Sequence, residues 1–255
     1  MTMHDDQIPG AKIWRYINLT KFVSLLGKQA LWFSSPAKFS DPYEGTLPKS
    51  HLKALSDMRQ NWIDNQLAQL DALAKMRPLA DFSKARASME ELRTGIQKML
   101  RDVALKFGVN CWHMSEHESD AMWRLYPNCI AIQSTWKRLH DSLLQDGVYI
   151  DPVRYNDFEN DPIEKGHRHQ NLFIKRKSFE YEKELRAVKM LDNVCEGQFI
   201  SCDLSVLIER VYVSPVSEFY VLEVVKDICF GGLPTLKQNV EVKRSTLLDV
   251  SPDYL

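Results

Sequence analysis

The spacing of apolar residues changes twice along the chain and divides it into three regions. Near the start, short apolar runs at 13–17 and 30–33 are typical of strands, with helical spacing between them. Over 50–107, apolar residues recur at three- and four-residue steps, which predicts two long helices broken at Pro78. After residue 108, short runs rich in β-branched side chains return and predict further strands.

Helix signals lie between the expected strands. After the first strand, Asn18 or Thr20 can cap a helix that stops at Gly27. The later strands are expected at 109–114, 129–132, 148–150, 185–188, 208–213 and 240–242. The later helices are expected at 120–126, 136–144, part of 164–176 and 217–228. This order predicts an α+β fold with a mixed, mainly antiparallel sheet, formed as a single domain over 1–255 with a helical hairpin inserted at 50–107.

Composition is that of an ordinary globular protein. With 44% hydrophobic residues, ten glycines and eleven prolines among 255 residues, the chain is neither disordered nor collagen-like. A formal charge of -1 argues against bulk binding of nucleic acid. The first residues lack the apolar run of a signal peptide, and no apolar stretch approaches the roughly 20 residues of a membrane span. Five scattered cysteines form no Cys-x-x-Cys pair. We therefore expect a cytoplasmic protein with reduced thiols and no membrane partner.

An acidic segment at 179–186 is the strongest candidate for chemistry. If this segment is a strand, Glu182, Glu184 and Arg186 point to one face, because residues two apart share a face. Two carboxylates beside a guanidinium can bind a polyol or stabilise a cation, and crowding separates their pKa values. The alternative is a solvated strand face with a charge pair and no function.

Arg15 lies between two aromatic residues in the first expected strand. A guanidinium there either pairs with a carboxylate or binds an anion such as phosphate. Farther along, the Ser115 hydroxyl and the rings of Trp123 and Tyr126 can form a ligand platform at a strand end. The alternative for Ser115 is a capping box with Glu118 at a helix start.

Known short motifs give little support to other chemistries. His113 and His117 match a His-x-x-Glu-His zinc pattern, but that pattern needs both residues on one helix, and 109–114 is predicted to be a strand. The glycine-rich loops of dinucleotide-binding and P-loop proteins are absent from the sequence.

Several of these segments resemble, in this order, a bacterial and phage family known as domain-of-unknown-function family 2971. The matching stretches are Ile13–Tyr16, Leu31–Pro36, Phe39–Glu44, Cys111–Ser115, Met122–Tyr126 and Tyr181–Arg186. The Asp-Pro-aromatic-Glu stretch beginning at Asp41 and the Glu-x-Glu-x-Arg stretch beginning at Glu182 are the most specific of them.

The order of elements is also similar to that of the ADP-ribosyltransferase superfamily, with its split sheet. This resemblance implies NAD as a substrate and requires no metal. It implies that Arg15 holds the ribose or phosphate of NAD, that Ser115 orders the nicotinamide side and that Tyr126 stacks on the ring. Glu184 would stabilise the oxocarbenium-like transition state, with Glu182 orienting the acceptor.

Three functions follow from these patterns. The first is an NAD-dependent ADP-ribosyltransferase-like enzyme that acts on nucleic acid or protein as a toxin or phage-defence effector. The second is a metal-dependent nuclease or hydrolase that uses Asp41, Glu44, His113 and Glu182. The third is a non-catalytic binding module whose hairpin recognises a partner such as an antitoxin.

Overall fold

The computed structural model describes residues 9–92, 96–126, 130–161, 169–231 and 240–249. By their contacts they form two compact units. Unit 1 consists of Met1–Lys38, Lys106–Val153 and Tyr181–Leu255, and unit 2 of Phe39–Leu105 and Arg154–Glu180. The hairpin expected at 50–107 contributes to unit 2, which also takes in the later segment. Among the described residues, no helix has both the length and the apolar character needed to cross a bilayer.

Unit 1 is built on a nine-stranded sheet of described residues. Along the sheet the order is β11-β10-β4-β1-β3-β2-β9, with β8 paired to β3 and β5 to β8. The strands are β1 (Lys12–Ile17), β2 (Ala30–Ser34), β3 (Phe107–Met114), β4 (Ile130–Thr135), β5 (Val148–Pro152), β8 (Glu184–Met190), β9 (Gly197–Ser201), β10 (Arg210–Val213) and β11 (Glu241–Arg244). The pairs are antiparallel apart from β10 with β11. The expected α+β class, with a mixed and mostly antiparallel sheet, is confirmed.

Two strands share one edge of β3. The other edge is paired with β8 along its length, from Phe107 to His113. On the shared edge, β1 pairs near Met114 and β2 pairs at Val109. Because β1 and β2 meet β3 at opposite ends, the middle of this edge has no backbone partner strand among the described residues.

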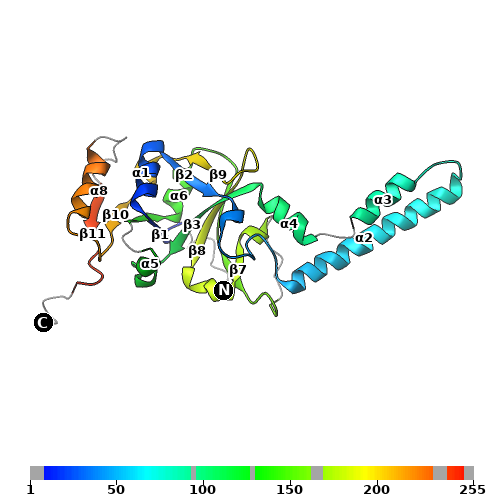
Figure 1. Ribbon diagram of the computed structural model, residues 1–255, viewed down its shortest axis with the longest axis horizontal. Helices are drawn as coiled ribbons and strands as arrows, with labels where there is room; N and C mark the ends of the chain where they lie inside the picture. Colours follow the sequence, from blue (N-terminus) through cyan, green and yellow to red (C-terminus); the bar gives the residue numbers. More distant parts are fainter. Residues whose placement is uncertain (1–8, 93–95, 127–129, 162–168, 232–239, 250–255) are drawn as a thin grey trace. The chain divides into compact units, whose positions relative to one another are not determined.

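The two faces of the sheet are covered differently. One face packs against α1 (Leu19–Lys28), α6 (Trp136–Ser142), α7 (Leu204–Leu207) and α8 (Val221–Phe230), and together they form the main hydrophobic core (Figure 1). On the other face, Trp14 and Tyr16 of β1 pack against α5 (Asp120–Leu125) in a smaller core. This split follows from the alternation of side chains along each strand.

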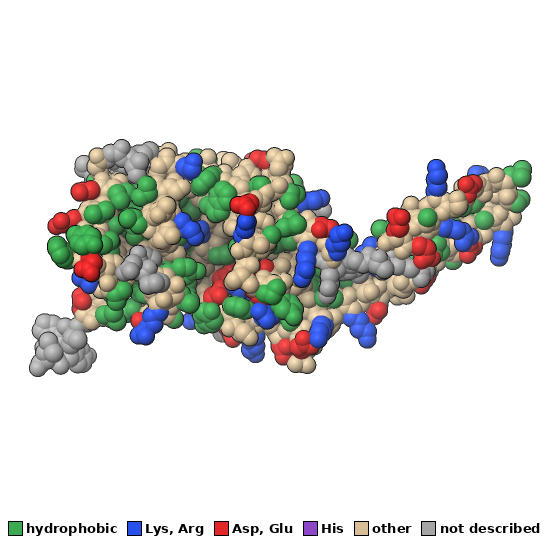
Figure 2. Space-filling model, in the orientation of Figure 1, with side chains coloured by type: hydrophobic (Ala, Val, Ile, Leu, Met, Phe, Trp, Pro, Cys, Tyr) green, Lys and Arg blue, Asp and Glu red, His purple; other side chains and the backbone are tan. Residues whose placement is uncertain are grey.

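Unit 2 has a small core and a long, exposed helical hairpin. Leu47, Phe158 and Ile174 form its core cluster. The helices are α2 (Lys49–Met76), α3 (Ser83–Glu91), which packs beside α2, and α4 (Ile96–Ala104). Figure 2 shows basic and acidic side chains interspersed along α2 and α3. The unit also contains β6 (Arg154–Asn156), η2 (Gln170–Leu172) and β7 (Ile174–Arg176), with β6 and β7 paired in parallel.

The structure corrects four local expectations. The expected second hairpin helix corresponds to two helices, α3 and α4, and α4 ends at Ala104 because the buried Phe107 already pairs with Met190 in the sheet. Gly27 does not stop α1, which ends at the left-handed Gln29. Residues 174–176, expected to be partly helical, form β7. Strand β9 was not expected, because its run of apolar residues is short. Residues 162–168 and Cys129 lie outside the described residues.

Candidate functional site

Polar side chains cluster on the α5-covered face of unit 1, where β3, β8 and β5 run side by side. His113 lies opposite Glu184, and Arg186 lies opposite Cys111 on one side and Asp151 on the other. Residues directly opposite each other in an antiparallel pair share a face. The alternate residues of these strands, such as Trp112 and Leu185, belong to the main core on the other face. The sheet therefore presents a row of ionisable groups on a rigid base.

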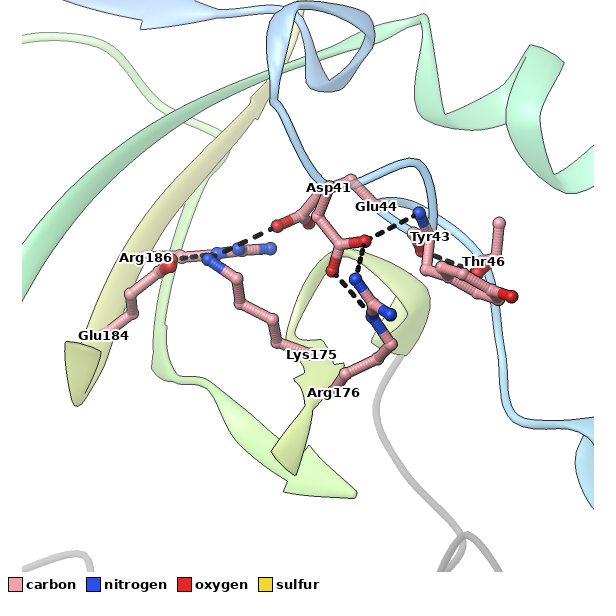
Figure 3. Close-up of polar contacts among 8 residues, drawn as sticks. All are labelled: Asp41, Tyr43, Glu44, Thr46, Lys175, Arg176, Glu184 and Arg186. Carbon is pink, nitrogen blue, oxygen red and sulfur yellow. Dashed lines mark hydrogen bonds and ion pairs between the residues drawn. The ribbon is translucent and has the colours of Figure 1, made fainter. Parts of the chain in front are cut away.

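Glu184 and Arg186 form a buried ion pair. The Nε atom of Arg186 donates to Oε2 of Glu184 at 2.6 Å, and the two residues are 1% and 6% exposed respectively (Figure 3). A charge-assisted bond of this kind fixes the orientation of the carboxylate. Since a buried charge without its partner is strongly unfavourable, each residue depends on the other. The expectation that Glu184 and Arg186 share a face is confirmed.

His113 is buried beside this pair and held in one tautomer. Its Nδ1 atom lies 2.6 Å from the carbonyl oxygen of Glu182. Since a carbonyl can only accept, Nδ1 carries the proton and Nε2 of the neutral ring is left as an acceptor. Burial lowers the pKa of His113 below its ordinary value, with a smaller effect of Lys183 in the same direction. The ring is therefore neutral at neutral pH and can act as an acceptor or base.

Tyr126 ends α5 near the acidic row. The helix begins with Ser119, whose side chain accepts from the backbone of Met122, and it packs on the same face of the sheet as His113. Burial raises the pKa of the Tyr126 phenol, and the carboxylates of Glu182 and Glu184 raise it further. The phenol therefore lies within electrostatic range of both glutamates, while the residue stays 46% exposed.

Glu182 does not continue the strand, as the alternation had predicted. It belongs to the 3-10 helix η3 (Lys177–Glu182), and Lys183 adopts a left-handed backbone with φ 41° before β8 begins at Glu184. The bend at Lys183 takes Glu182 out of the register of Glu184 and Arg186. Glu182 contacts His113 through its backbone carbonyl.

Arg15 of β1 points toward the middle of β3, in the gap where β1 and β2 separate. Its Nη1 atom donates to Oδ1 of Asn110 at 2.8 Å and to the carbonyl of Cys111 at 2.7 Å. The guanidinium also lies 5.8 Å from the ring centre of Trp112. Burial lowers the pKa of Arg15, whereas Cys111 and Tyr126 raise it. The Arg15 side chain leaves the face of the sheet opposite to that of Glu184. The Tyr126 phenol interacts electrostatically with both Arg15 and Glu184.

Ser115 and Trp123 have structural contacts. The carbonyl of Ser115 accepts from Nε1 of Trp14 at 2.8 Å, and its hydroxyl accepts from the backbone of His117. Trp123 is 4% exposed, packs edge-on against Tyr16 and donates from Nε1 to Glu118. The expected platform thus retains Tyr126, whereas the Trp123 ring is part of the smaller core. The cap of α5 is Ser119, not the Ser115 capping box.

The carboxylates of unit 2 that were considered as metal ligands are paired with cations. Arg176 donates from Nε and Nη2 to the two oxygens of Asp41, at 3.2 and 2.8 Å (Figure 3). Nζ of Lys175 lies 3.6 Å from Oε1 of Glu44. Within the described ranges, no group of three or more His, Cys, Asp or Glu side chains is arranged to hold a metal ion. The metal-dependent alternative therefore gains no support from these residues.

Sequence reasoning missed one member of the polar row, Asp151, and gave another, His113, a different role. Asp151 ends a short strand, and its position opposite Arg186 depends on the β5–β8 pairing. The sequence places His113 in a zinc-like pattern, whereas the structure places it beside Glu184. Alternation in 109–114 does place His113 on the face opposite Trp112, but the register with β8 is a tertiary property.

Comparison of the chain with models of known protein families, with curated proteins and with solved structures gives no match. The function is therefore inferred from the geometry of the site.

Proposed function

We propose that the chain is an NAD-consuming ADP-ribosyltransferase-like enzyme that modifies nucleic acid or protein. The observation that carries the proposal is the Glu184 carboxylate, fixed by Arg186 at 2.6 Å and buried beside His113. A toxin or phage-defence setting is part of the proposal.

The shared edge of β3 supports the proposal as well. Strands β1 and β2 separate along this edge, in keeping with the split sheet of the superfamily. Arg15 lies in the gap, and within the described part of the chain both of its hydrogen bonds are made by Nη1. Its remaining N–H groups are therefore available to a phosphate oxygen, which is the role that the resemblance implies for Arg15.

The proposed reaction breaks the bond between C1′ of the nicotinamide ribose and the ring nitrogen. Nicotinamide leaves with the electron pair, and positive charge develops on the ribose. The Glu184 carboxylate stabilises that charge more strongly in the transition state than in bound NAD, because the charge forms as the bond breaks. An acceptor nucleophile then bonds to C1′, and Glu182, half-buried at the end of η3, orients it and takes its proton.

The test is release of nicotinamide and transfer of labelled ADP-ribose from NAD in cell extract. We expect Glu184→Gln to lower the rate about 10²- to 10³-fold, as removal of one charge-stabilising group does. Glu218→Gln is the matched control, because Glu218 is exposed on unit 1, and its rate should equal that of the wild type.

A second variant separates catalysis from folding. Glu184→Gln removes a charge that the buried Arg186 binds, and we expect it to destabilise unit 1. Tyr126 is half-exposed, so we expect Tyr126→Ala to fold and to weaken NAD binding. A folded wild-type chain that neither binds NAD nor releases nicotinamide in cell extract would contradict the proposal.

A further inference from the structure

Unit 2 contains an open pocket, and none of its lining residues is used above for catalysis. Its volume is about 550 Å³, within the range of small-ligand sites. Aromatic, basic, acidic and polar side chains line it, among them Tyr43, Phe158, Arg176, Lys177, Asp157 and Glu159. Each of these residues belongs to unit 2.

Arg176 is rigidly mounted at this pocket. Asp41 binds one edge of its guanidinium through Nε and Nη2. The Tyr43 and Phe179 rings lie 4.6 and 5.3 Å from the guanidinium carbon. In the described part of the chain Nη1 makes no hydrogen bond, so the edge opposite Asp41 is available to a ligand (Figure 3). A planar guanidinium held in this way is suited to a phosphate oxygen.

The other cations and anions of the pocket favour a ligand of low negative charge. Lys177 is exposed and forms no ion pair with a described residue. The acidic groups are already bound: Asp157 accepts from Asn160 at 2.8 Å, and Glu159 accepts from Lys49 at 2.5 Å. Donors are therefore left for a ligand while the carboxylates are satisfied, which selects an anion. Because the positive and negative side chains around the pocket nearly balance, a monophosphate or phosphodiester fits better than a polyphosphate.

Tyr43 adds a stacking surface. Its ring is 47% exposed, although Arg176 lies over it and Phe158 contacts it edge-on at 5.9 Å. An exposed ring fixed beside a phosphate-binding edge is the combination that proteins use to hold nucleotides, because every base has a π-face. The distance from a base to its phosphate is within the span of a pocket of this volume.

We propose that this pocket binds a nucleoside phosphate, with the phosphate on Nη1 of Arg176 and Nζ of Lys177 and the base on Tyr43. The nucleotide is either free or part of a single strand, since both present the same chemistry. The proposal does not depend on the NAD-consuming activity of unit 1.

Calorimetric titration of the full chain with adenosine monophosphate tests this site. We expect the nucleotide to bind more tightly than either adenosine or inorganic phosphate, because each of these lacks one of the two contacts. Lys177→Ala and Tyr43→Leu should each weaken binding about tenfold, the loss expected for one phosphate contact or one stacked base. Lys84→Glu, a charge change on the exposed face of α3, should leave the affinity unchanged.

Two further experiments identify the source of the nucleotide and the location of its binding site. A short single-stranded oligoadenylate that binds more tightly than the mononucleotide identifies the ligand as a nucleic acid strand, and the reverse order identifies a free nucleotide. Tyr126→Ala should keep mononucleotide binding even if it loses NAD. The inference would be overturned if the mononucleotide did not bind, or if Lys177→Ala and Tyr43→Leu bound it with the affinity of the wild type. Loss of mononucleotide binding in Tyr126→Ala would also overturn it. Lys177 is exposed, so its variant should remain folded and informative.

Discussion

At the scale of single residues, burial decides what the polar groups of unit 1 can do. Arg186 is almost fully buried and binds the Glu184 carboxylate directly. His113 is buried with one ring nitrogen bound to a carbonyl, which favours the neutral ring. Burial disfavours the charged form of both groups, and their partners differ: Glu184 is bound by a cation, whereas the His113 ring is bound to a carbonyl and stays neutral.

The pH dependence of stability follows from the His113 pKa. The unfolded chain takes up a proton near the ordinary pKa of 6.5, whereas the folded chain resists it to lower pH. Below about pH 7 the unfolded state therefore binds more protons, and the free energy of unfolding falls as the pH falls. We expect His113→Gln to show a smaller loss of stability between about pH 7 and pH 5 than the wild type, measured by urea denaturation.

A matched control separates this effect from general acid denaturation. His117→Gln changes an exposed histidine four residues away, and its loss of stability over the same pH range should equal that of the wild type. Equal slopes for all three proteins would show that His113 does not contribute.

At the scale of elements, the ends of helices and strands follow local chemistry where one candidate residue has the right geometry. The helix α1 begins after Asn18, whose Oδ1 accepts from the backbone N–H of Lys21 at 2.9 Å. Thr20, the other candidate cap, lies two residues too late, inside the helix. The end of α1 is decided instead by tertiary context, because the chain must turn into β2 at Ala30.

The two candidate caps give a direct stability test. Asn18→Ala removes a hydrogen bond to an otherwise unpaired helix N–H, so we expect the free energy of unfolding to drop by about 1 kcal/mol. Thr20→Ala changes an exposed position within the helix and should alter it by less than about 0.5 kcal/mol. Chemical denaturation of both variants distinguishes the roles, and equal losses would contradict the cap assignment.

At the scale of the whole molecule, the chain passes repeatedly between two units. Unit 1 is assembled from three segments and unit 2 from two, so neither unit can be isolated by a single truncation. Within unit 2, the distal part of the hairpin buries little: no residue from Leu67 to Glu90 is buried, and Leu79 is fully exposed. An exposed ion pair joins Asp71 of α2 to Arg86 of α3.

The distal hairpin should be dispensable for folding. Replacing residues 67–90 by a short Gly–Ser turn joins positions that the Asp71–Arg86 pairing places opposite each other. Because the removed residues bury almost no apolar surface, we expect the free energy of unfolding to change by less than about 1 kcal/mol. Circular dichroism and thermal denaturation measure this, and failure of the shortened chain to fold would contradict it.

The same deletion bears on the third sequence hypothesis. If the hairpin recognises a partner, the shortened chain keeps its NAD turnover and loses its biological effect. If both persist, the distal hairpin is not the recognition surface.

The sequence by itself determined the fold class, most strands and the long helix, because these depend on local periodicity. Strands β1, β2 and β3 and helix α2 lie close to where alternation and helical spacing predict them. Alternation also predicted the shared face of Glu184 and Arg186. Such features need no knowledge of distant residues.

The tertiary structure alone decided which of these side chains meet. The register of β3, β8 and β5 placed His113 and Asp151 beside the Glu184–Arg186 pair, and a left-handed residue at Lys183 removed Glu182 from the strand. Packing of α5 buried Trp123 and left Tyr126 half-exposed. Register and packing depend on contacts between residues far apart along the chain, and periodicity within one segment carries no information about them.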